Sequence, residues 1–564
     1  MWLFPSDDLD ANQSELSVPG MSNSWSRAEH LKDLADTDEL DVLVIGGGVI
    51  GAGSTLDAAT RGLRVGLVEM SDFASGTSSR STKLFHGGIR YLPHFEFGLV
   101  HEGLAEQKIL ARTADFLYDP LEFLIPMYRG RRLADLPSWA SAPRLAPLAM
   151  RIGLLLYDTL GRRPRGSHRA VSRNELLASV PTLLTDGLNG GFGYMDAQTD
   201  DSRLVLTVIK TAVERYNALA VNHLVATRIE RRGAGYLVHV SDQLSDASFA
   251  IKTRSIIAAT GALKPPPAGN AEPADVRLSA GAHLIMNKAE IGLGDEALLL
   301  PETDDGRVMF VVPWLDTAMV GTTDTPYTEN PAHPRATDDD VAYLMRHLRM
   351  YLDIGDIEPI SAFSGLRALM DDGGSTAEAS RGHEVINVSP GYVQVAGGKL
   401  TTYRRIAQET VDVVARYLKA DASSRTDVEL LIGAAVGAHA QDIVSEQLSG
   451  LGVDSAHSRN LLRRYGARAQ EIVSTIKEDR RLGTSLSDAT TVLAEVRYAA
   501  NFEGAATIGD FALRRTHAAW FSRNHARDDA KLIADELAVA LGWSDRETAS
   551  QLDAFESELI VEGL

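Results

Sequence analysis

Short apolar runs separated by glycine mark the first part of the chain. Residues 41–45 (Asp-Val-Leu-Val-Ile) form a β-branched run, and Gly46-Gly-Gly-Val-Ile-Gly51 follows it directly. A helical-looking stretch then leads to a second buried run at residues 64–69 (Arg-Val-Gly-Leu-Val-Glu). Strand, glycine turn, helix and strand in this order predict a βαβ unit.

The middle of the chain shows strand patterns without long helices between them. Residues 255–261 are typical of a buried strand that ends in a small-residue turn. The runs at 282–286, 308–312 and 318–321 alternate with turn signals. That alternation predicts an antiparallel sheet.

Helical spacing dominates later in the chain. Asp200 and Asp201 are interpreted as caps of a helix over the next residues rather than as catalysts. A strand at 392–396 and a turn at Gly397-Gly398 precede a helix predicted from Lys399 onward. Beyond residue 421 the apolar positions keep helical spacing, so a helical C-terminal domain is expected. The apolar face of the helix after Lys399 is Tyr403, Ala407, Val411, Val414 and Leu418.

Composition narrows the class of protein. With 564 residues and 44% apolar content the chain can bury a large core. The formal charge of −20 argues against a nucleic-acid partner. Because cysteine is absent, disulfides, thiolate metal sites and cysteine nucleophiles are excluded, and redox chemistry must come from a cofactor. No D-x-D-x-D-G calcium loop occurs, and no metal site is expected.

Two segments bear on location. Residues 1–38 are polar and acidic and lack the features of a signal peptide, so a mobile N-terminal extension is expected. No run of roughly 20 apolar residues occurs, so no membrane-spanning helix is expected, and the protein is expected to be cytoplasmic or peripheral on the cytoplasmic membrane face. Arginines around the apolar run 152–156 suit an anionic membrane surface; an ordinary core helix with a solvated rim is the alternative. These arginines are Arg129, Arg131, Arg132, Arg144, Arg151, Arg162, Arg163 and Arg165.

The glycine run carries a dinucleotide-binding fingerprint. Gly46 permits the tight turn, Gly48 lets the backbone approach a pyrophosphate, and Gly51 allows close packing of helix on strand. The new helix directs its N-terminal amides at the phosphates. Glu69 ends the second strand, where a carboxylate accepts ribose hydroxyls, and its charge favours FAD or NAD over NADP.

The segment 71–91 is rich in serine, threonine and glycine. Such a loop suits the wrapping of a phosphorylated cofactor through amides and short hydroxyls; a plain surface loop is the alternative. His86, Arg90 and Tyr91 add a base, a guanidinium and a phenol, which favour a site for an anionic, oxidisable substrate. Lys399 is predicted at a helix N-terminus, where a cation is disfavoured, and that mismatch favours a functional role.

Longer motifs give a definite resemblance. The run from Thr77 to Leu92 (Thr-Ser-Ser-Arg-Ser-Thr-Lys-Leu-Phe-His-Gly-Gly-Ile-Arg-Tyr-Leu) resembles the FAD-dependent glycerol-3-phosphate dehydrogenases. The likeness returns at 194–204, 321–324, 364–367 and 397–404. It covers about residues 38–420 and, more weakly, the rest, and the chain departs from it at Ala262-Leu-Lys264 and the prolines that follow.

The resemblance implies roles for individual residues. His86 is the expected base, because an imidazole with a reference pKa of ~6.5 accepts a proton at physiological pH. Arginines would hold the phosphate or polarise the oxygens, and Lys399 would steady the alkoxide or flavin. The implied catalytic residues are His86, Arg90, Arg367 and Lys399, and the implied substrate-binding residues are Arg90, Tyr91, Thr323, Arg367, Arg381 and His383. The implied cofactor-binding residues are Gly46, Gly48, Gly51, Glu69, Thr77, Ser78, Ser81, Thr82, Lys83, Leu84, His86, Gly87, Thr260, Gly261, Gly398, Lys399, Leu400 and Thr401.

The resemblance also implies fold and activity. The expected fold class is α/β plus α+β: a Rossmann-like FAD-binding domain (39–110, 190–265 and 385–420), an antiparallel-sheet substrate domain (111–189 and 266–384) and a helical C-terminal domain (421–564). The expected reaction is oxidation of sn-glycerol 3-phosphate to dihydroxyacetone phosphate by hydride transfer to FAD, with a membrane quinone as acceptor. An oxygen-using oxidase and a non-catalytic flavin-binding sensor are the alternatives, and a homo-oligomer is compatible with the sequence.

Overall fold

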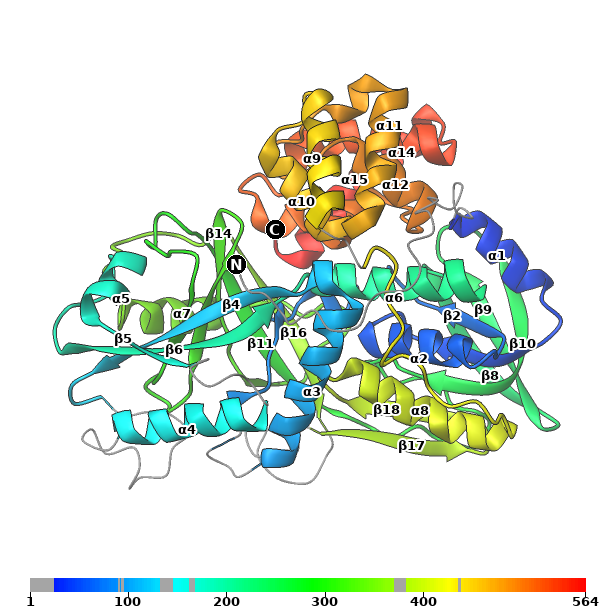
Figure 1. The fold of residues 1–564 in the computed structure, drawn as a ribbon. Helices are drawn as coiled ribbons and strands as arrows, with labels where there is room; N and C mark the ends of the chain where they lie inside the picture. The colour runs from blue at the N-terminus through cyan, green and yellow to red at the C-terminus, as the bar shows by residue number, and fades with distance from the viewer. Residues whose placement is uncertain are drawn as a thin grey trace.

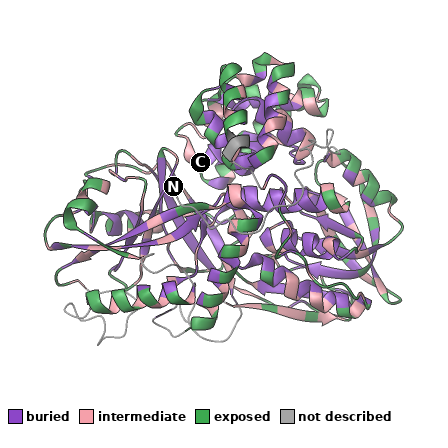
Figure 2. Cartoon of the chain, viewed as in Figure 1, coloured by how far each residue is buried: buried purple, intermediate pink, exposed green. Residues whose placement is uncertain are grey.

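Two sheet-based halves lie side by side, and a helical domain packs against them (Figure 1). The computed structural model describes residues 25–89, 92, 96–131, 146–161, 168–369, 382–434 and 438–564. Buried residues fill the sheets and the inner faces of the helices, while exposed residues lie on the outer faces (Figure 2). This arrangement confirms the predicted fold class.

The first half is built on an eight-stranded sheet in the order β17-β18-β10-β1-β2-β7, and β9 joins β10 to β8. The pairings from β18 through β10, β1 and β2 to β7 are all parallel. Parallel strands are buried on both faces, which explains why their sequences are continuous apolar runs. The strands are β1 (Leu40–Ile45), β2 (Val65–Val68), β7 (Leu219–Val221), β8 (Leu224–Arg232), β9 (Gly235–Asp242), β10 (Ser248–Ala258), β17 (His383–Ser389) and β18 (Tyr392–Gly397).

Three helices pack together beside this sheet. Helix α2 (Val49–Thr60) contacts both α6 (Asp201–Tyr216) and α8 (Tyr403–Leu418). β1, α2 and β2 confirm the predicted βαβ unit. Asp200 is the N-cap of α6 and accepts a hydrogen bond from the Arg203 amide at 3.0 Å, as predicted for a capping aspartate.

The segment before β1 differs from its prediction. Residues 1–38 were expected to be a mobile extension. Residues 1–24 lie outside the described residues, and the described part contains helix α1 (Arg27–Asp36), capped by Ser26. The Trp25 side chain is fully buried, and its ring nitrogen donates to the Ala220 carbonyl at 3.1 Å. His30 and Leu34 on α1 are also buried. A few apolar residues in a polar segment therefore suffice to anchor a helix on β7.

The second half is built on a ten-stranded sheet in the order β15-β11-β14-β13-β12-β4-β6-β3, with β16 paired to β11 and β5 to β6. The predicted antiparallel pairing is confirmed for β11, β13 and β14, whereas β12 pairs with β4 in parallel. The strands are β3 (Leu84–Phe85), β4 (Asp119–Tyr128), β5 (Arg169–Val171), β6 (Leu188–Gln198), β11 (Arg277–Asn287), β12 (Ala297–Leu300), β13 (Met309–Trp314), β14 (Thr317–Gly321), β15 (Thr325–Tyr327) and β16 (Ser361–Leu369).

Two features of this half differ from the sequence interpretation. β6 lies in the second sheet, although the segment from residue 190 was assigned to the cofactor domain. Helix α7 (Asp338–Arg349) interrupts a region predicted to lack long helices. Its capping box, formed by Thr337 and Asp340, is a sequence signal that the interpretation passed over. Helices α3 (Phe97–Thr113), α4 (Ala146–Leu160) and α5 (Arg173–Ser179) complete this half.

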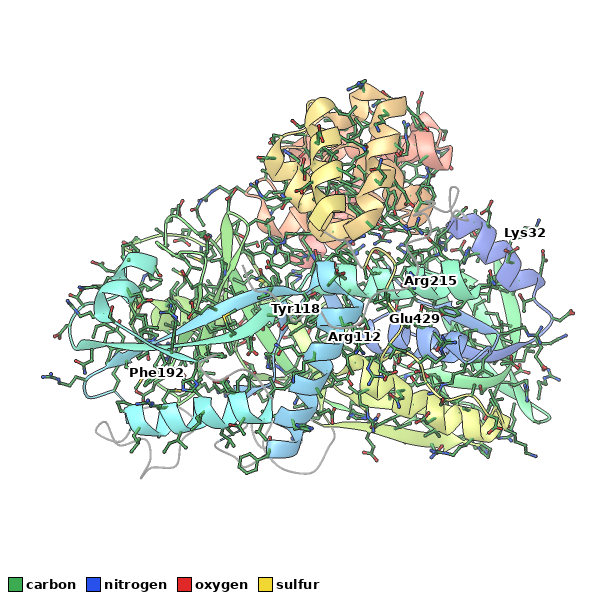
Figure 3. The ribbon with its side chains drawn as sticks, viewed as in Figure 1. Lys32, Arg112, Tyr118, Phe192, Arg215 and Glu429 are labelled. Carbon is green, nitrogen blue, oxygen red and sulfur yellow. The ribbon has the colours of Figure 1, made fainter. Side chains whose placement is uncertain are left out.

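The C-terminal domain is helical, as predicted. Its docking on α6 includes a buried ion pair in which Arg203 contacts both oxygens of Glu503 at 2.8 and 2.6 Å. The segment that follows α8 is held by two arginines, Arg112 and Arg215, which Figure 3 labels together with Glu429. Arg215 pairs with Glu429 at 2.8 Å, and Arg112 donates to the Asp427 carbonyl. The domain contains α9 (Ala438–Gly450), α10 (Ser455–Tyr465), α11 (Ala469–Glu478), α12 (Ala494–Phe502), a π-helix (Asp510–Arg515), α13 (Ala518–Phe521), α14 (Ala530–Leu541) and α15 (Asp545–Glu562).

Candidate active site

The turn between β1 and α2 has a backbone that only glycine fits. Gly46 has φ +108°, and a Cβ there would lie 2.5 Å from the Ala259 carbonyl oxygen at the end of β10. A Cβ at Gly51 would lie 1.8 Å from the Gly46 carbonyl oxygen, so α2 packs directly on the turn. Gly48 is the N-cap of α2 and has no capping side chain. A helix N-terminus of this kind receives a phosphate.

Glu69 follows β2 and closes on the same turn. Its Oε2 accepts from the Gly47 amide at 2.6 Å and its Oε1 from the Ser71 amide at 2.9 Å. Burial raises the pKa of the Glu69 carboxyl, and the two amide hydrogen bonds oppose that rise. A carboxylate keeps further lone pairs after these two bonds, so Glu69 can still accept from ribose hydroxyls.

The loop after Gly76 joins the glycine turn to the second sheet. Ser78 Oγ accepts from the Val49 amide at the start of α2, at 2.9 Å. Thr77 Oγ1 donates to the Leu366 carbonyl of β16 at 2.5 Å. The loop therefore contacts both halves, α2 of the first and β16 of the second.

Lys83 is fully buried within this loop, and its side chain is bound by protein groups. The ammonium pairs with the Asp201 carboxylate and donates to the Ser79 carbonyl at 3.3 Å. It also lies 3.3 Å from Nε2 of His517 in the C-terminal domain. Ser81 holds the same carboxylate through its amide at 3.1 Å and its hydroxyl at 2.7 Å. Because these groups occupy the ammonium, only the backbone of Lys83 is left to contact a cofactor.

His86 lies at the end of the loop, beside the turn that precedes α8. Its amide donates to Thr401 Oγ1 at 3.2 Å. The next amide, of Gly87, donates to the Tyr157 hydroxyl at 2.8 Å. Leu84 and Phe85 are buried in β3, which pairs with β6, so Phe85 and Gly87, the two neighbours of His86, are both fixed by the fold.

The turn before α8 differs from the prediction. α8 begins at Tyr403, and Lys399 lies in the turn rather than in the first helical turn. The electrostatic argument for Lys399 at a helix N-terminus therefore does not apply to it. Gly398 has φ +101°, so the turn itself requires glycine. The predicted apolar face of α8 is buried, as expected.

The second sheet brings a histidine to the loop. His283 on β11 is buried, and its Nε2 lies 2.9 Å from Thr82 Oγ1. Its ring stacks on Phe363 with centroids 5.2 Å apart. Burial, with Arg367 and Lys83 as nearby cations, lowers the pKa of His283 to about 3. His283 is therefore a neutral imidazole at physiological pH.

Arg367 on β16 is directed across β11. A Cβ at Gly281 would lie 2.5 Å from its Nη2, which shows how closely the guanidinium crosses the strand. Nη1 donates to the Thr323 carbonyl at 3.3 Å, and Nη2 donates to Thr322 Oγ1 at 3.3 Å. Asp324 Oδ1 lies 3.6 Å from Nη1. A guanidinium in this position suits a phosphate ligand.

Other predicted residues lie elsewhere or outside the described residues. Thr323 Oγ1 accepts from the Ala282 amide at 2.9 Å, so Thr322 is the hydroxyl that faces Arg367. The His383 imidazole pairs with Glu409 of α8 at 2.8 Å. At the end of β10, Thr260 donates to the Leu263 carbonyl at 2.5 Å and Gly261 has φ +60°; Leu400 lies in the turn before α8. The predictions for Arg90, Tyr91 and Arg381 fall outside the described residues.

Sequence reasoning missed His283 and Thr322. His283 lies in β11 and Thr322 directly follows β14, in a region that was predicted only as part of a sheet. A polar residue inside an apolar strand run, such as His283 between Ala282 and Leu284, was the available signal. Its hydrogen-bond partner, Thr82, lies 201 positions earlier in the sequence, so no local pattern indicates the contact.

The residues present fit a flavin dinucleotide. The glycine turn leaves no room for a side chain at Gly46 or Gly51, and the first turn of α2 has no capping side chain of its own. Glu69 closes the same turn with a carboxylate that can accept hydrogen bonds from ribose hydroxyls. The loop beyond Gly76 and the turn at Gly398 continue the site toward His86, and Arg367 and His283 lie on its sheet side.

Two family models match the chain in succession. The model described as FAD dependent oxidoreductase matches residues 41–404. The model described as the C-terminal domain of alpha-glycerophosphate oxidase matches residues 424–548.

Named relatives cover nearly the whole chain. The chain is 35% identical to glycerol-3-phosphate dehydrogenase 2 of Mycobacterium tuberculosis, over 93% of this chain and 89% of that protein. It is 31% identical to the aerobic glycerol-3-phosphate dehydrogenase of Staphylococcus aureus, over 96% of this chain and 97% of that one. The solved glycerol-3-phosphate dehydrogenase of Bacillus halodurans complexed with FAD matches with a TM-score of 0.76 and 27% identity, over 95% and 98% of the two chains.

Proposed function

Because the chain belongs to the family of FAD-dependent glycerol-3-phosphate dehydrogenases, we propose that it oxidises sn-glycerol 3-phosphate to dihydroxyacetone phosphate. The observation that carries the proposal is the 35% identity to a relative of that name across 93% of the chain. The site adds the required chemistry, since it combines a dinucleotide turn with a histidine and an arginine at the junction of the two sheets.

FAD, when bound, supplies the acceptor for the hydride of the secondary alcohol. The glycine turn and the N-terminus of α2 hold its pyrophosphate, and Glu69 accepts hydrogen bonds from the ribose. Thr77, Ser78 and the turn at Gly398 enclose the rest. The cofactor should be recovered as one FAD per chain from purified protein, and recovery of only NAD or FMN would refute this assignment.

Arg367 binds the phosphate of the substrate in this proposal. Its guanidinium presents several donors to a planar or tetrahedral anion, and such charge-assisted hydrogen bonds are strong. The acidic chain, with a net charge of −20, must provide its cations locally to bind a phosphate dianion. Thr322 holds the guanidinium in its orientation across β11.

His86 is the proposed base that accepts the proton of the reacting hydroxyl. His283 is the other imidazole at the site, but a pKa of about 3 makes it a weak base in the unliganded protein. His283 is better suited to hydrogen bonding with the substrate or with Thr82, because it stays neutral near pH 7.

Anaerobic mixing of the purified protein with glycerol 3-phosphate tests the activity directly. Bleaching of the flavin absorbance is the expected result, and an unchanged spectrum would refute the proposal. Re-oxidation then separates the acceptors: a quinone acceptor predicts fast re-oxidation by a quinone analogue and little peroxide. Peroxide in stoichiometric yield would favour an oxygen-using oxidase instead.

Within the described ranges, none of the helices combines the length and hydropathy needed to cross a bilayer.

Helix α4 is the element proposed to contact a membrane surface. Leu148, Ile152 and Leu155 share one face and are 57%, 58% and 57% exposed, and Arg151 lies among them, also exposed. An exposed face that combines large aliphatic residues with a cation is typical of an interfacial helix. α4 lies along the edge of the molecule opposite the C-terminal domain (Figures 1 and 2).

The arginine assignment changes with the structure. Arg131 was expected to contact lipid, but its guanidinium lies over the Tyr128 and Tyr351 rings at 4.7 and 4.4 Å and donates to the Met350 carbonyl. Arg131 therefore packs between β4 and the residues that follow α7. Of the other arginines in this group, Arg132, Arg144, Arg162, Arg163 and Arg165 lie outside the described residues.

Liposome binding tests α4. Replacing Leu148, Ile152 and Leu155 with serine should weaken partitioning into anionic vesicles by roughly two to three orders of magnitude, at about 1 to 1.5 kcal/mol per side chain. The matched control replaces Leu532 and Val539, which are exposed on α14 of the C-terminal domain. Equal loss in both variants, or none in the α4 variant, would refute the assignment.

A further inference from the structure

The loop that follows β2 packs on the glycine turn at several points. Glu69 accepts from the Gly47 amide, and Ala74 donates its amide to the Gly47 carbonyl at 3.0 Å. The Phe73 ring lies where a Cβ on Gly47 would come within 2.7 Å of it. The position of this loop therefore sets the position of Gly47, on the turn that receives the dinucleotide.

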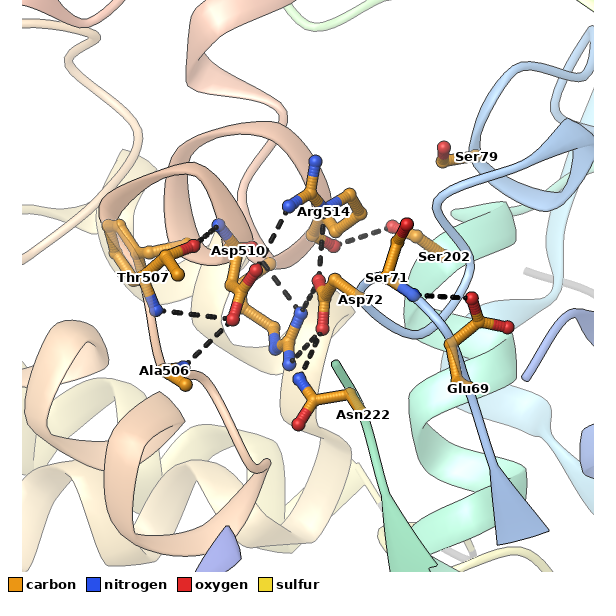
Figure 4. A network of polar contacts seen from close by, with 12 residues as sticks. Glu69, Ser71, Asp72, Ser79, Ser202, Asn222, Ala506, Thr507, Asp510 and Arg514 are labelled. Atoms are coloured by element: carbon orange, nitrogen blue, oxygen red, sulfur yellow. Dashed lines mark hydrogen bonds and ion pairs between the residues drawn. The ribbon is translucent and has the colours of Figure 1, made fainter. Parts of the chain in front are cut away.

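Asp72 lies at the centre of this loop and is completely buried. Its Oδ1 accepts from Asn222 Nδ2 at 2.8 Å and from Arg515 Nη2 at 3.1 Å. Its Oδ2 accepts from Arg514 Nε at 2.9 Å and also from Arg515 Nη1. Both arginines belong to the π-helix of the C-terminal domain, and Figure 4 shows Arg514 above Asp72. One buried carboxylate of the cofactor half is thus held by two guanidinium groups of another domain.

A second contact joins the same two segments. The His223 amide donates to the Ser71 carbonyl at 2.6 Å, and its Nε2 lies 3.1 and 3.0 Å from the two oxygens of Asp510. Burial lowers the pKa of His223, but the Asp510 carboxylate outweighs burial and raises the pKa above its ordinary value. Asp510 also accepts from Arg514 Nη2 at 3.0 Å. His223 therefore links the π-helix to the loop at Ser71, the residue before Asp72.

The cluster is a salt bridge network rather than a metal centre. Ligand atoms of Asp72, His223 and Asp510 lie within 4.8 Å of one another. The two carboxylates, however, pair with Arg514 and Arg515, whose positive charges already compensate them. Breaking a buried ion pair by removing one partner leaves an uncompensated charge and is strongly destabilising.

We propose that Asp72 is a positioning residue of the cofactor site, held by Arg514 and Arg515 so that Gly47 and Glu69 keep the geometry that binds FAD. The inference rests on the FAD-dependent function proposed above. It has a reciprocal consequence: if docking of the C-terminal domain strengthens FAD binding, FAD must strengthen docking by the same factor. The C-terminal domain is then part of the cofactor site, although none of its residues is assigned to contact the cofactor.

Asp72→Asn is the test variant, and Glu503→Gln is its matched control. Glu503 also belongs to a buried interdomain ion pair, but the partner of its carboxylate, Arg203, lies on α6 and not on the loop. Arg515 donates to the backbone carbonyl of Glu503 at 2.8 Å, a contact that Glu503→Gln leaves in place. FAD affinity is measured by titrating each apoprotein with FAD, and the stability of each apoprotein is measured by thermal unfolding. Asp72→Asn should raise the FAD dissociation constant at least roughly fivefold, the lower end of couplings between sites. Glu503→Gln should lower stability and leave the dissociation constant within about twofold of wild type.

Hydrogen exchange gives a readout that a purely structural role would not move. In the wild type, FAD should slow exchange across residues 503–517, and Asp72→Asn should lose this slowing while Glu503→Gln keeps it. If Asp72→Asn does not fold, Arg515→Lys keeps the charge, removes the bidentate contact and should raise the dissociation constant in the same way. Equal FAD affinity in the loop variant and the control would overturn the inference. Wild-type apoprotein that binds no FAD would refute the proposed function instead, and this inference with it.

Discussion

Substitution of Arg367 provides the sharpest test of how the substrate is held. The Arg367 side chain is 33% exposed, and its guanidinium lies across β11 toward Thr322. A phosphate bound there would receive charge-assisted hydrogen bonds worth roughly 1.5 to 3 kcal/mol. Because the phosphate is present in the bound substrate and in the transition state alike, losing these bonds weakens binding more than it slows the bound-state reaction.

Arg367→Ala should therefore raise the substrate dissociation constant by roughly 10- to 150-fold, at 1.36 kcal/mol per factor of ten. The limiting rate of flavin reduction should change much less. Arg367→Lys keeps the charge but loses the fork of donors, so its effect should be intermediate. Stopped-flow reduction over a range of glycerol 3-phosphate concentrations separates the dissociation constant from the limiting rate.

Arg254→Ala is the control for loss of a positive charge. Arg254 pairs with Asp41 on the surface of the first sheet, and its side chain is 45% exposed. Its removal should leave both quantities near wild type. An unchanged dissociation constant for Arg367→Ala, or equal effects in both variants, would refute the assignment of Arg367 to the phosphate.

Two further predictions concern the histidines. His86→Ala should slow flavin reduction by roughly a hundredfold or more with the substrate dissociation constant little changed, as measured by stopped flow, because the proton acceptor is lost; near wild-type reduction would move the base to another residue. Since the folded-state pKa of His283 is depressed to about 3, its contribution to stability is present above the unfolded pKa of ~6.5 and is lost as pH falls toward 3. Urea unfolding should show about 2 kcal/mol of this loss between roughly pH 6.5 and 5, and His283→Asn should lack it; parallel pH dependence in the two proteins would contradict the assigned pKa.

Local chemistry explains why the cofactor half was predictable. The glycines at 46 and 51 are required by a positive φ and by a backbone contact within a few residues, so the turn is encoded where it forms. The Asp200 cap and the apolar face of α8 are equally local. The order of β1, α2 and β2, and with it the parallel pairing of the two strands, follows from such short-range signals.

Long-range packing explains what the sequence interpretation missed. Trp25 turns a polar segment into an anchored helix only because the Ala220 carbonyl and β7 are there to receive it. α8 starts at Tyr403 rather than at Lys399 because the turn at Gly398 leads into residues 400–402 before helical hydrogen bonding begins. Local propensity cannot report the Trp25 anchor, since that contact joins residues 195 positions apart in sequence.

The amino-acid sequence by itself determined the dinucleotide turn, the acid that closes it, the likeness to a known family and the helical character of the C-terminal part. Only the tertiary structure placed His283 beside Thr82 and directed Arg367 across β11. It alone joined Asp72 to Arg514 and Arg515, residues separated by 442 and 443 positions. A local sequence pattern does not predict such a buried charge, because the opposite charge that compensates it belongs to another domain.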